Sequence, residues 1–82
     1  MDRQARASSA ADLPGNPFER GIHFSAGRGG HIDFVEAHEW FNIAAAGGDR
    51  SAAQHRDELA SEMSQREIAA ALKAAREWIK RH

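Results

Sequence analysis

The stretch DFVEAHEWFNIAAAGGD, residues 33–49, decides the fold. Asp33 is a residue type that favours the helix N-cap, and Glu36, three positions later, completes a pair of the capping-box kind. The apolar residues that follow recur at helical spacing, which predicts a helix over 33–46; they are Phe34, Ala37, Trp40, Phe41, Ala44 and Ala45. Gly47 and Gly48 end this helix, because glycine accepts the left-handed conformation that follows a helix C-terminus.

Two more helices are predicted downstream. A helix is predicted over residues 50–63, with Asp49 as its N-cap. Its apolar side consists of Ala52, Ala53, Leu59, Ala60 and Met63. Arg56 lies inside that apolar stripe; Asp57 and Glu58 do not share its helix face, so its partner stays open. Ser64 and Glu67 form a capping box, and an apolar stripe follows at i, i+3, i+4 and i+7; it consists of Ile68, Ala71, Leu72, Ala75, Trp78 and Ile79. The short connections predict that neighbouring helices pack as antiparallel hairpins.

The N-terminal part has a different composition. Both prolines lie at positions 14 and 17, where they favour turns. We expect residues 1–17 to be a disordered or irregular tail and residues 18–82 to be one helical domain. Residues 18–24 predict one or two helical turns with their apolar side chains inward, and residues 27–30 predict a flexible connector.

Composition excludes several classes of protein. The chain has 82 residues, a net charge of −1 and no cysteine, which excludes disulfides and cysteine-ligated metal centres. It has no apolar run near the roughly 20 residues that cross a bilayer. Balanced charge gives no general attraction to nucleic acid. The lack of cysteine is typical of a reducing compartment, so we expect a cytoplasmic protein.

The sequence predicts no catalytic residue, no cofactor and no metal ligand. No two of the five histidines stand three or four positions apart, as two ligands on one helix face would, and His55 with Glu58 three positions later forms only a weak patch. No nucleophile-elbow motif occurs among the serines, and the glycine-rich residues 27–30 lack the lysine and hydroxyl residue of a phosphate-binding loop. We therefore expect a binding protein rather than an enzyme.

Residues 33–49 resemble the Sel-one-like repeat, a relative of the tetratricopeptide repeat that also occurs in short bacterial proteins. The family pattern has an Asp that opens the helix, an Ala, a Trp-aromatic pair, an Ala-Ala pair and a Gly-containing turn. Matching positions here are Asp33, Ala37, Trp40, Phe41, Ala44, Ala45 and Gly48. Residues 21–30 resemble the end of a preceding unit, although Gly29-Gly30-His31 departs from the usual Gly-x-Gly-Val connector. Residues 64–82 resemble a closing helix.

The resemblance implies an all-α fold, in which an antiparallel helical hairpin and a C-terminal capping helix form a fragment of an α/α solenoid. It also implies an adaptor or scaffold that binds another protein. The chain holds only one full repeat, whereas solenoids normally need about three for a continuous core. We therefore expect self-association at high concentration.

Two sets of residues are predicted to form the protein-binding surface. Apolar residues would be left open where the next repeat is missing; these are Phe18, Ile22, Phe24, Leu72 and Trp78. Polar contacts would come from the groove beside the first hairpin; these are His38, Glu39, Asn42 and Arg56.

Two alternatives remain open at this stage. The chain could be a truncated repeat protein that only self-associates. It could also be a weak nucleic-acid binder that uses the C-terminal end of the last helix together with Arg50, Arg56, Arg66 and Arg76.

Overall fold

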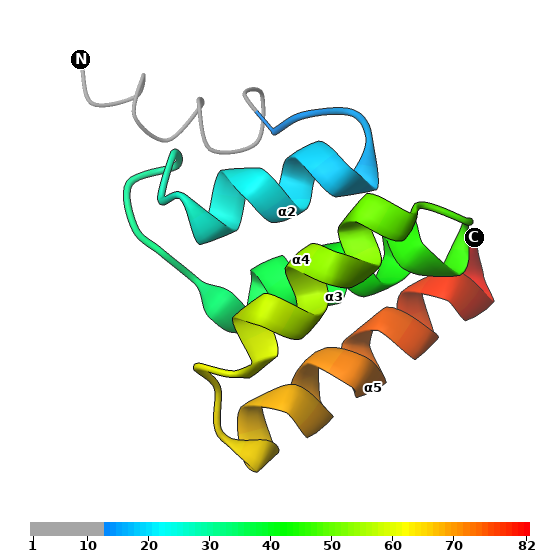
Figure 1. Ribbon diagram of the computed structural model, residues 1–82. Helices are drawn as coiled ribbons and strands as arrows, with labels where there is room; N and C mark the ends of the chain where they lie inside the picture. The colour runs from blue at the N-terminus through cyan, green and yellow to red at the C-terminus, as the bar shows by residue number, and fades with distance from the viewer. Residues whose placement is uncertain (1–12) are drawn as a thin grey trace.

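A computed structural model describes residues 13–82, which fold into helices joined by short connections. The helices are α2 (Pro17–Ser25), α3 (Phe34–Ala46), α4 (Arg50–Ala60) and α5 (Gln65–Arg81) (Figure 1). The described part of the chain contains no strand, so the prediction of an all-helical fold is confirmed for it. The predicted tail over residues 1–17 lies largely outside the described residues, and Pro17 already belongs to α2.

Each helix begins at a side chain that accepts a hydrogen bond from the first turn, as the sequence predicts for three of them. Asp33, Asp49 and Ser64 accept from the backbone N–H of Glu36, Ala52 and Glu67. At α2, Asn16 accepts from the Glu19 N–H and Pro17 takes the first helical position. Such a cap is worth about 1 kcal/mol, because it satisfies a donor that the helix leaves unpaired.

Only one of the two predicted capping boxes forms. At α5, the Glu67 side chain accepts from the Ser64 N–H at 2.8 Å and the box is complete. At α3, the Asp33 N–H donates instead to the Phe24 carbonyl oxygen at 3.0 Å. This contact joins the connector to the end of α2. Because the Asp33 N–H is already used, the Glu36 side chain cannot accept a hydrogen bond from it.

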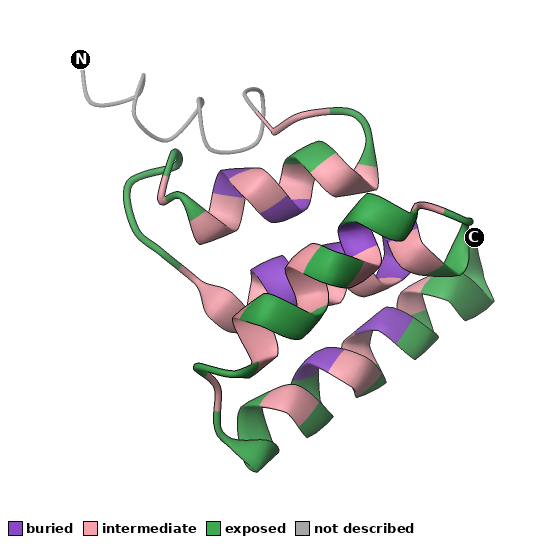
Figure 2. Cartoon of the chain, viewed as in Figure 1, coloured by how far each residue is buried: buried purple, intermediate pink, exposed green. Residues whose placement is uncertain are grey.

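Helix α3 is the centre of the bundle, since α2, α4 and α5 all pack chiefly against it. Figure 2 shows buried residues concentrated on α3 and on the sides of the other helices that face it. The expected hairpin between α4 and α5 is wrong, because α5 packs against α3 and makes little contact with α4. Helix α4 also ends at Ala60, three residues before the predicted end.

The core divides into two apolar clusters on different sides of α3. The first surrounds Phe41, which is 1% exposed, and contains Ala37, Ala44 and Ala52. The second contains Trp40, Ile43 and Ala75, with Trp78 packed against it. Two neighbouring residues of one helix, Trp40 and Phe41, therefore hold different partner helices.

Two glycines shape these contacts. A side chain at Gly21 would collide with the Phe41 ring, so glycine at this point lets α2 approach α3 closely. Gly48 has a φ of +104°, a conformation that favours glycine, and it turns the chain from α3 into α4.

Candidate functional site

Helices α2, α3 and α5 expose an apolar surface where α3 ends. Two hollows lie there, and Ile43 borders both of them. The larger, of about 400 Å³, lies beside Phe18, Ala44 and Asp49. The smaller, of about 290 Å³, lies between α3 and α5 beside Ala46, Trp78 and Ile79. We call this surface the end face and define it by Phe18, Ile43, Trp78 and Ile79.

Helix register explains why α5 leaves apolar side chains at this end. Ala71 and Ala75 lie against α3 and are fully buried, and Trp78 continues the same stripe half-buried. Ile79 lies beside that stripe near the helix end, where α3 no longer covers it, and is 42% exposed. A bulky aliphatic side chain beside a half-buried tryptophan is typical of a surface that excludes water when a partner binds.

The Trp78 ring is held in place by aromatic contacts. It meets the Trp40 ring edge to face, with centroids 5.5 Å apart, and stacks on the His82 ring at 4.0 Å. The Arg20 guanidinium lies over the Trp40 ring at 4.6 Å. A column of four planar groups thus runs from α2 through α3 to the end of α5, and the Trp78 ring packs between two of them at the end face.

The apolar residues predicted as binding surface divide between the end face and the packed helices. Phe18 and Trp78 border the end face. Ile22 and Phe24 pack against the Phe41 cluster from α2, and they occupy the core side of that helix. Leu72 is half-buried on α5, away from both hollows of the end face.

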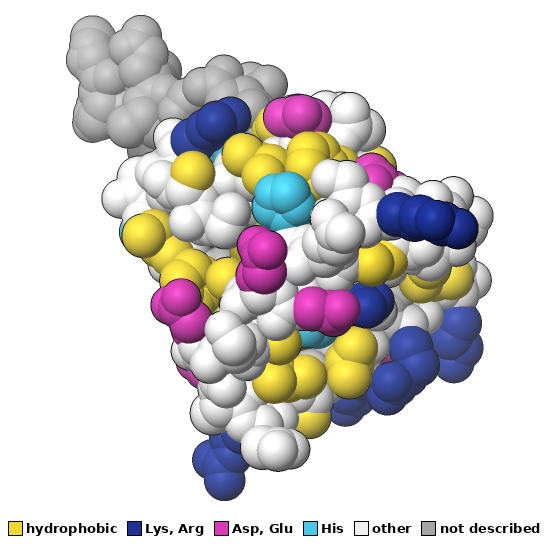
Figure 3. Space-filling model, in the orientation of Figure 1, with side chains coloured by type: hydrophobic (Ala, Val, Ile, Leu, Met, Phe, Trp, Pro, Cys, Tyr) yellow, Lys and Arg dark blue, Asp and Glu magenta, His cyan; other side chains and the backbone are white. Residues whose placement is uncertain are grey.

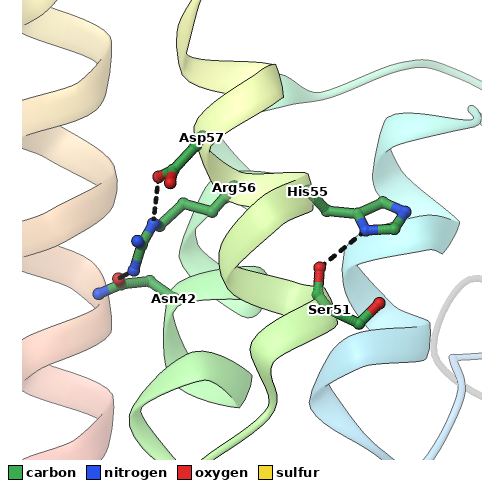
Figure 4. A network of polar contacts seen from close by, with 5 residues as sticks. All are labelled: Asn42, Ser51, His55, Arg56 and Asp57. Carbon is green, nitrogen blue, oxygen red and sulfur yellow. Dashed lines mark hydrogen bonds and ion pairs between the residues drawn. The ribbon is translucent and has the colours of Figure 1, made fainter.

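Two of the predicted polar residues are joined to each other. Arg56 donates to the Asn42 side-chain oxygen at 2.9 Å and also pairs with Asp57 at 3.0 Å (Figure 4). The sequence leaves the partner of Arg56 open because Asp57 lies on a different helix face, and the long Arg56 side chain nevertheless reaches Asp57. The contact ties α4 to α3 and holds the Arg56 head between them.

The prediction that His38 supplies a surface contact is wrong. His38 is 2% exposed, and its Nδ1 atom has no hydrogen-bond partner among the described residues. Burial lowers the pKa of His38, and the nearby Arg56 cation lowers it further. His38 is therefore a neutral group of the α3–α4 contact and not part of an open site.

Glu39 lies on α3, one turn before Ile43, and is half-buried. Its pKa is raised to about 7, first because the carboxyl group is partly buried and then because Glu36 and Asp33 lie near it. Among the causes of this shift, every charged neighbour is another carboxyl group of the start of α3 or its N-cap.

His55 belongs to the Phe41 cluster, a place that sequence reasoning missed. Its ring lies 5.1 Å from the Phe18 ring and 5.2 Å from the Phe41 ring. Its Nδ1 atom lies 2.9 Å from the Ser51 carbonyl oxygen, so that nitrogen carries the proton (Figure 4). The only sequence signal was its spacing of three from Ala52 and four from Leu59 on the apolar side of α4.

Among residues 13–82 no three His, Asp or Glu side chains lie together as metal ligands would. None of the helices in that range is long and apolar enough to cross a membrane.

The comparisons with known proteins found no family model, no curated protein and no solved structure that matches this chain.

Proposed function

We propose that the chain is a protein-interaction module, an adaptor or scaffold of the Sel-one-like kind, that binds its partner through the end face. The observation that carries this proposal is the pairing of the fixed, half-buried Trp78 with the 42% exposed Ile79 beside a hollow of about 290 Å³. Tryptophan at the centre of an apolar surface is the residue type that most often dominates binding energy. We propose no catalytic residue and no cofactor.

The placement of the repeat-like residues supports the resemblance on which the adaptor role depends. The Trp-aromatic pair and two of the alanines are buried on α3, as stacked helical hairpins require; these are Trp40, Phe41, Ala37 and Ala44.

A binding experiment tests the proposal in two steps. The tagged full chain is used as bait in the cells that express it, and co-purifying proteins are identified by mass spectrometry. The identified protein is then purified, and its affinity is measured by calorimetry with wild-type chain, Trp78→Ala and Arg66→Ala. The control, Arg66→Ala, changes an exposed residue at the opposite end of the same helix.

We expect Trp78→Ala to weaken binding tenfold or more, since truncation of a central tryptophan costs about 2 kcal/mol or more. Arg66→Ala should leave the affinity unchanged. Circular dichroism checks that both variants keep their helices. Equal affinities of all three proteins, with helices intact, would contradict the proposal.

A further inference from the structure

Charge is divided unequally between α5 and the rest of the described chain. Residues 65–82 carry five Lys or Arg and two Glu, whereas residues 13–64 carry four Arg and eight Asp or Glu. The net charges are therefore +3 and −4. In Figure 3 the basic side chains gather along α5, and acidic side chains lie across the face formed by α4. Within residues 13–82, none of the five cations lies within ion-pair distance of a carboxylate.

The acidic side chains of α4 lie near its C-terminus, where the helix dipole makes negative charge unfavourable. Asp57 and Glu58 lie in the last turn of α4 and Glu62 follows just after its end. A helix C-terminus carries partial negative charge, so each anion there is unfavourable by about 0.3–1 kcal/mol. Helix α5 follows the opposite and favourable pattern, with Glu67 in its first turn and Lys80 and Arg81 in its last.

A hollow of about 200 Å³ lies beside these carboxylates, between α4 and the end of α2. Phe41, His55 and Leu59 line its apolar part, and Glu58 and Glu62 lie at its rim. It offers space for one aliphatic side chain with acidic groups beside it. At the end face, Ile79 is an exposed aliphatic side chain with cations beside it, since Arg76 lies one turn earlier and Lys80 is the next residue.

We propose that a second copy of this chain docks head to tail, with Ile79 of one copy in the α2–α4 hollow of the next and with Arg76 and Lys80 against Glu58 and Glu62. This inference rests on the proposed function, because it assigns the Ile79 side of the same end face to a partner. The two surfaces lie at opposite ends of the bundle, since α5 ends where α4 begins (Figure 1). One copy can therefore use both surfaces at once.

Charge also selects this arrangement over a symmetric dimer. If two α5 helices met, their unpaired cations would face each other, and like charges in contact are strongly unfavourable. A head-to-tail contact pairs opposite charges and leaves a free surface at each end, so it builds open chains of increasing length. The contact consists of one aliphatic side chain and two ion pairs, far fewer groups than the about 20–30 residues a side of a standard interface, so we expect weak association.

Sedimentation velocity of the full chain tests this inference. We expect the sedimentation coefficient to rise between about 10 µM and 1 mM, the affinity range of small contacts. The rise should shrink as salt goes from about 0.15 M to 1 M, because the screening length falls from about 8 to 3 Å.

Two charge-reversed variants give the decisive comparison, Arg76→Glu/Lys80→Glu and Glu58→Lys/Glu62→Lys. Each should stay monomeric alone, and an equimolar mixture should associate again, because the reversed surfaces complement each other. All four positions are exposed, and circular dichroism checks that the helices persist. A wild-type chain that is monomeric throughout, variants that associate like wild type, or a mixture that stays monomeric would each overturn the inference.

The outcome separates this inference from the proposed function. If the chain is monomeric throughout but a Trp78-dependent partner is found, the inference is wrong and the proposed function stands. If the chain associates as described but Trp78→Ala keeps full affinity for a co-purified protein, the end face is only a self-association surface. If monomeric wild-type chain binds a short duplex DNA, and Arg76→Glu/Lys80→Glu abolishes that binding, the cations belong to a nucleic-acid site and the inference is overturned.

Discussion

The Phe41 side and the Trp40 side of α3 differ in how far their aromatic contacts extend toward solvent. The Phe41 ring is enclosed by α2 and α4, with Phe18 and His55 against it and only 1% of its surface exposed. The Trp40 ring is also buried, but its contacts continue outward through Trp78 to the end face. Adjacent residues thus lead to a buried ring that only borders the α2–α4 hollow on one side, and to the half-buried Trp78 ring at the end face on the other.

This difference gives Phe41 chiefly a role in folding and Trp78 chiefly a role in binding. A domain of this size buries only about 60% of its unfolded surface, so a closed cluster is needed for stability. The half-buried Trp78 contributes less to the stability of the bundle than the buried Phe41 does. We expect substitution of the buried Phe41 ring to affect folding most and substitution of Trp78 to affect partner binding most.

The largest effect should follow Phe41→Ala. Removing a fully buried ring leaves a cavity and typically costs about 3–5 kcal/mol, a large share of the stability of a domain this small. Urea denaturation followed by circular dichroism should show the variant largely unfolded without denaturant. A loss below about 1 kcal/mol would mean that the ring is not enclosed as described.

Gly21→Ala tests the same side from α2. The added methyl group would meet the Phe41 ring, and overpacking of this kind costs about 1–3 kcal/mol. The midpoint of thermal unfolding should fall. Gly15→Ala is a control, because no atom lies within 4 Å of the position of its added methyl group. Equal midpoints for the two variants would show that α2 does not approach α3 closely.

Trp78→Ala should have a smaller effect on folding. The ring is only half-buried, so its loss should cost about 1–2 kcal/mol, less than Phe41→Ala. The variant should remain folded with a lowered urea midpoint, while its binding falls as described above. A destabilisation equal to that of Phe41→Ala would place Trp78 in the closed core and remove the distinction between the sides.

The smallest effect is the pH dependence that Glu39 gives to stability. The raised pKa of Glu39, about 7, favours the protonated folded state, so its contribution to stability is present below pH 4.5 and is lost as pH rises through about 7. Glu39→Gln should therefore stabilise the chain at about pH 8 by no more than about 1 kcal/mol, since the group is partly exposed and solvent screens its charge. Near pH 4.5 the gain should nearly vanish.

His38 gives stability the opposite pH dependence, and its effect must be separated from that of Glu39. Because its pKa is lowered, its contribution to stability is present above pH 6.5 and is lost as pH falls below that value. Both proteins retain His38, so the difference between wild type and Glu39→Gln isolates the carboxyl group. A difference that is the same at both pH values would show that the Glu39 pKa is not raised.

Local signals predicted most of the fold and less of the candidate site. The N-caps at Asp33, Asp49 and Ser64 were predicted because capping depends on residues three positions apart. The burial of His38 was not, because α3 is covered by three helices and therefore buries more than the single apolar stripe that the periodicity shows. The capping box at Asp33 does not form because the Asp33 N–H donates to the Phe24 carbonyl oxygen of α2. No local sequence pattern contains this contact between distant residues.

Trp78 illustrates the same limit within the site. The sequence placed it at helical spacing and named it as a surface candidate, but could not tell which neighbour would hold it. Its partners are Trp40 from α3 and His82 from the end of its own helix. The unequal charge of α4 and α5 can be counted in the sequence. Only the structure shows that the basic and acidic surfaces lie at opposite ends of the bundle.

The accessibility of the two tryptophans tests the distinction between the sides of α3 most directly. The chain is prepared with fluorinated tryptophan, its two fluorine resonances are assigned with Trp78→Phe, and a soluble paramagnetic agent is added. We predict strong broadening of the Trp78 resonance and little broadening of the Trp40 resonance, whose residue is 6% exposed. Equal broadening, or stronger broadening for Trp40, would contradict an open surface that begins at Trp78.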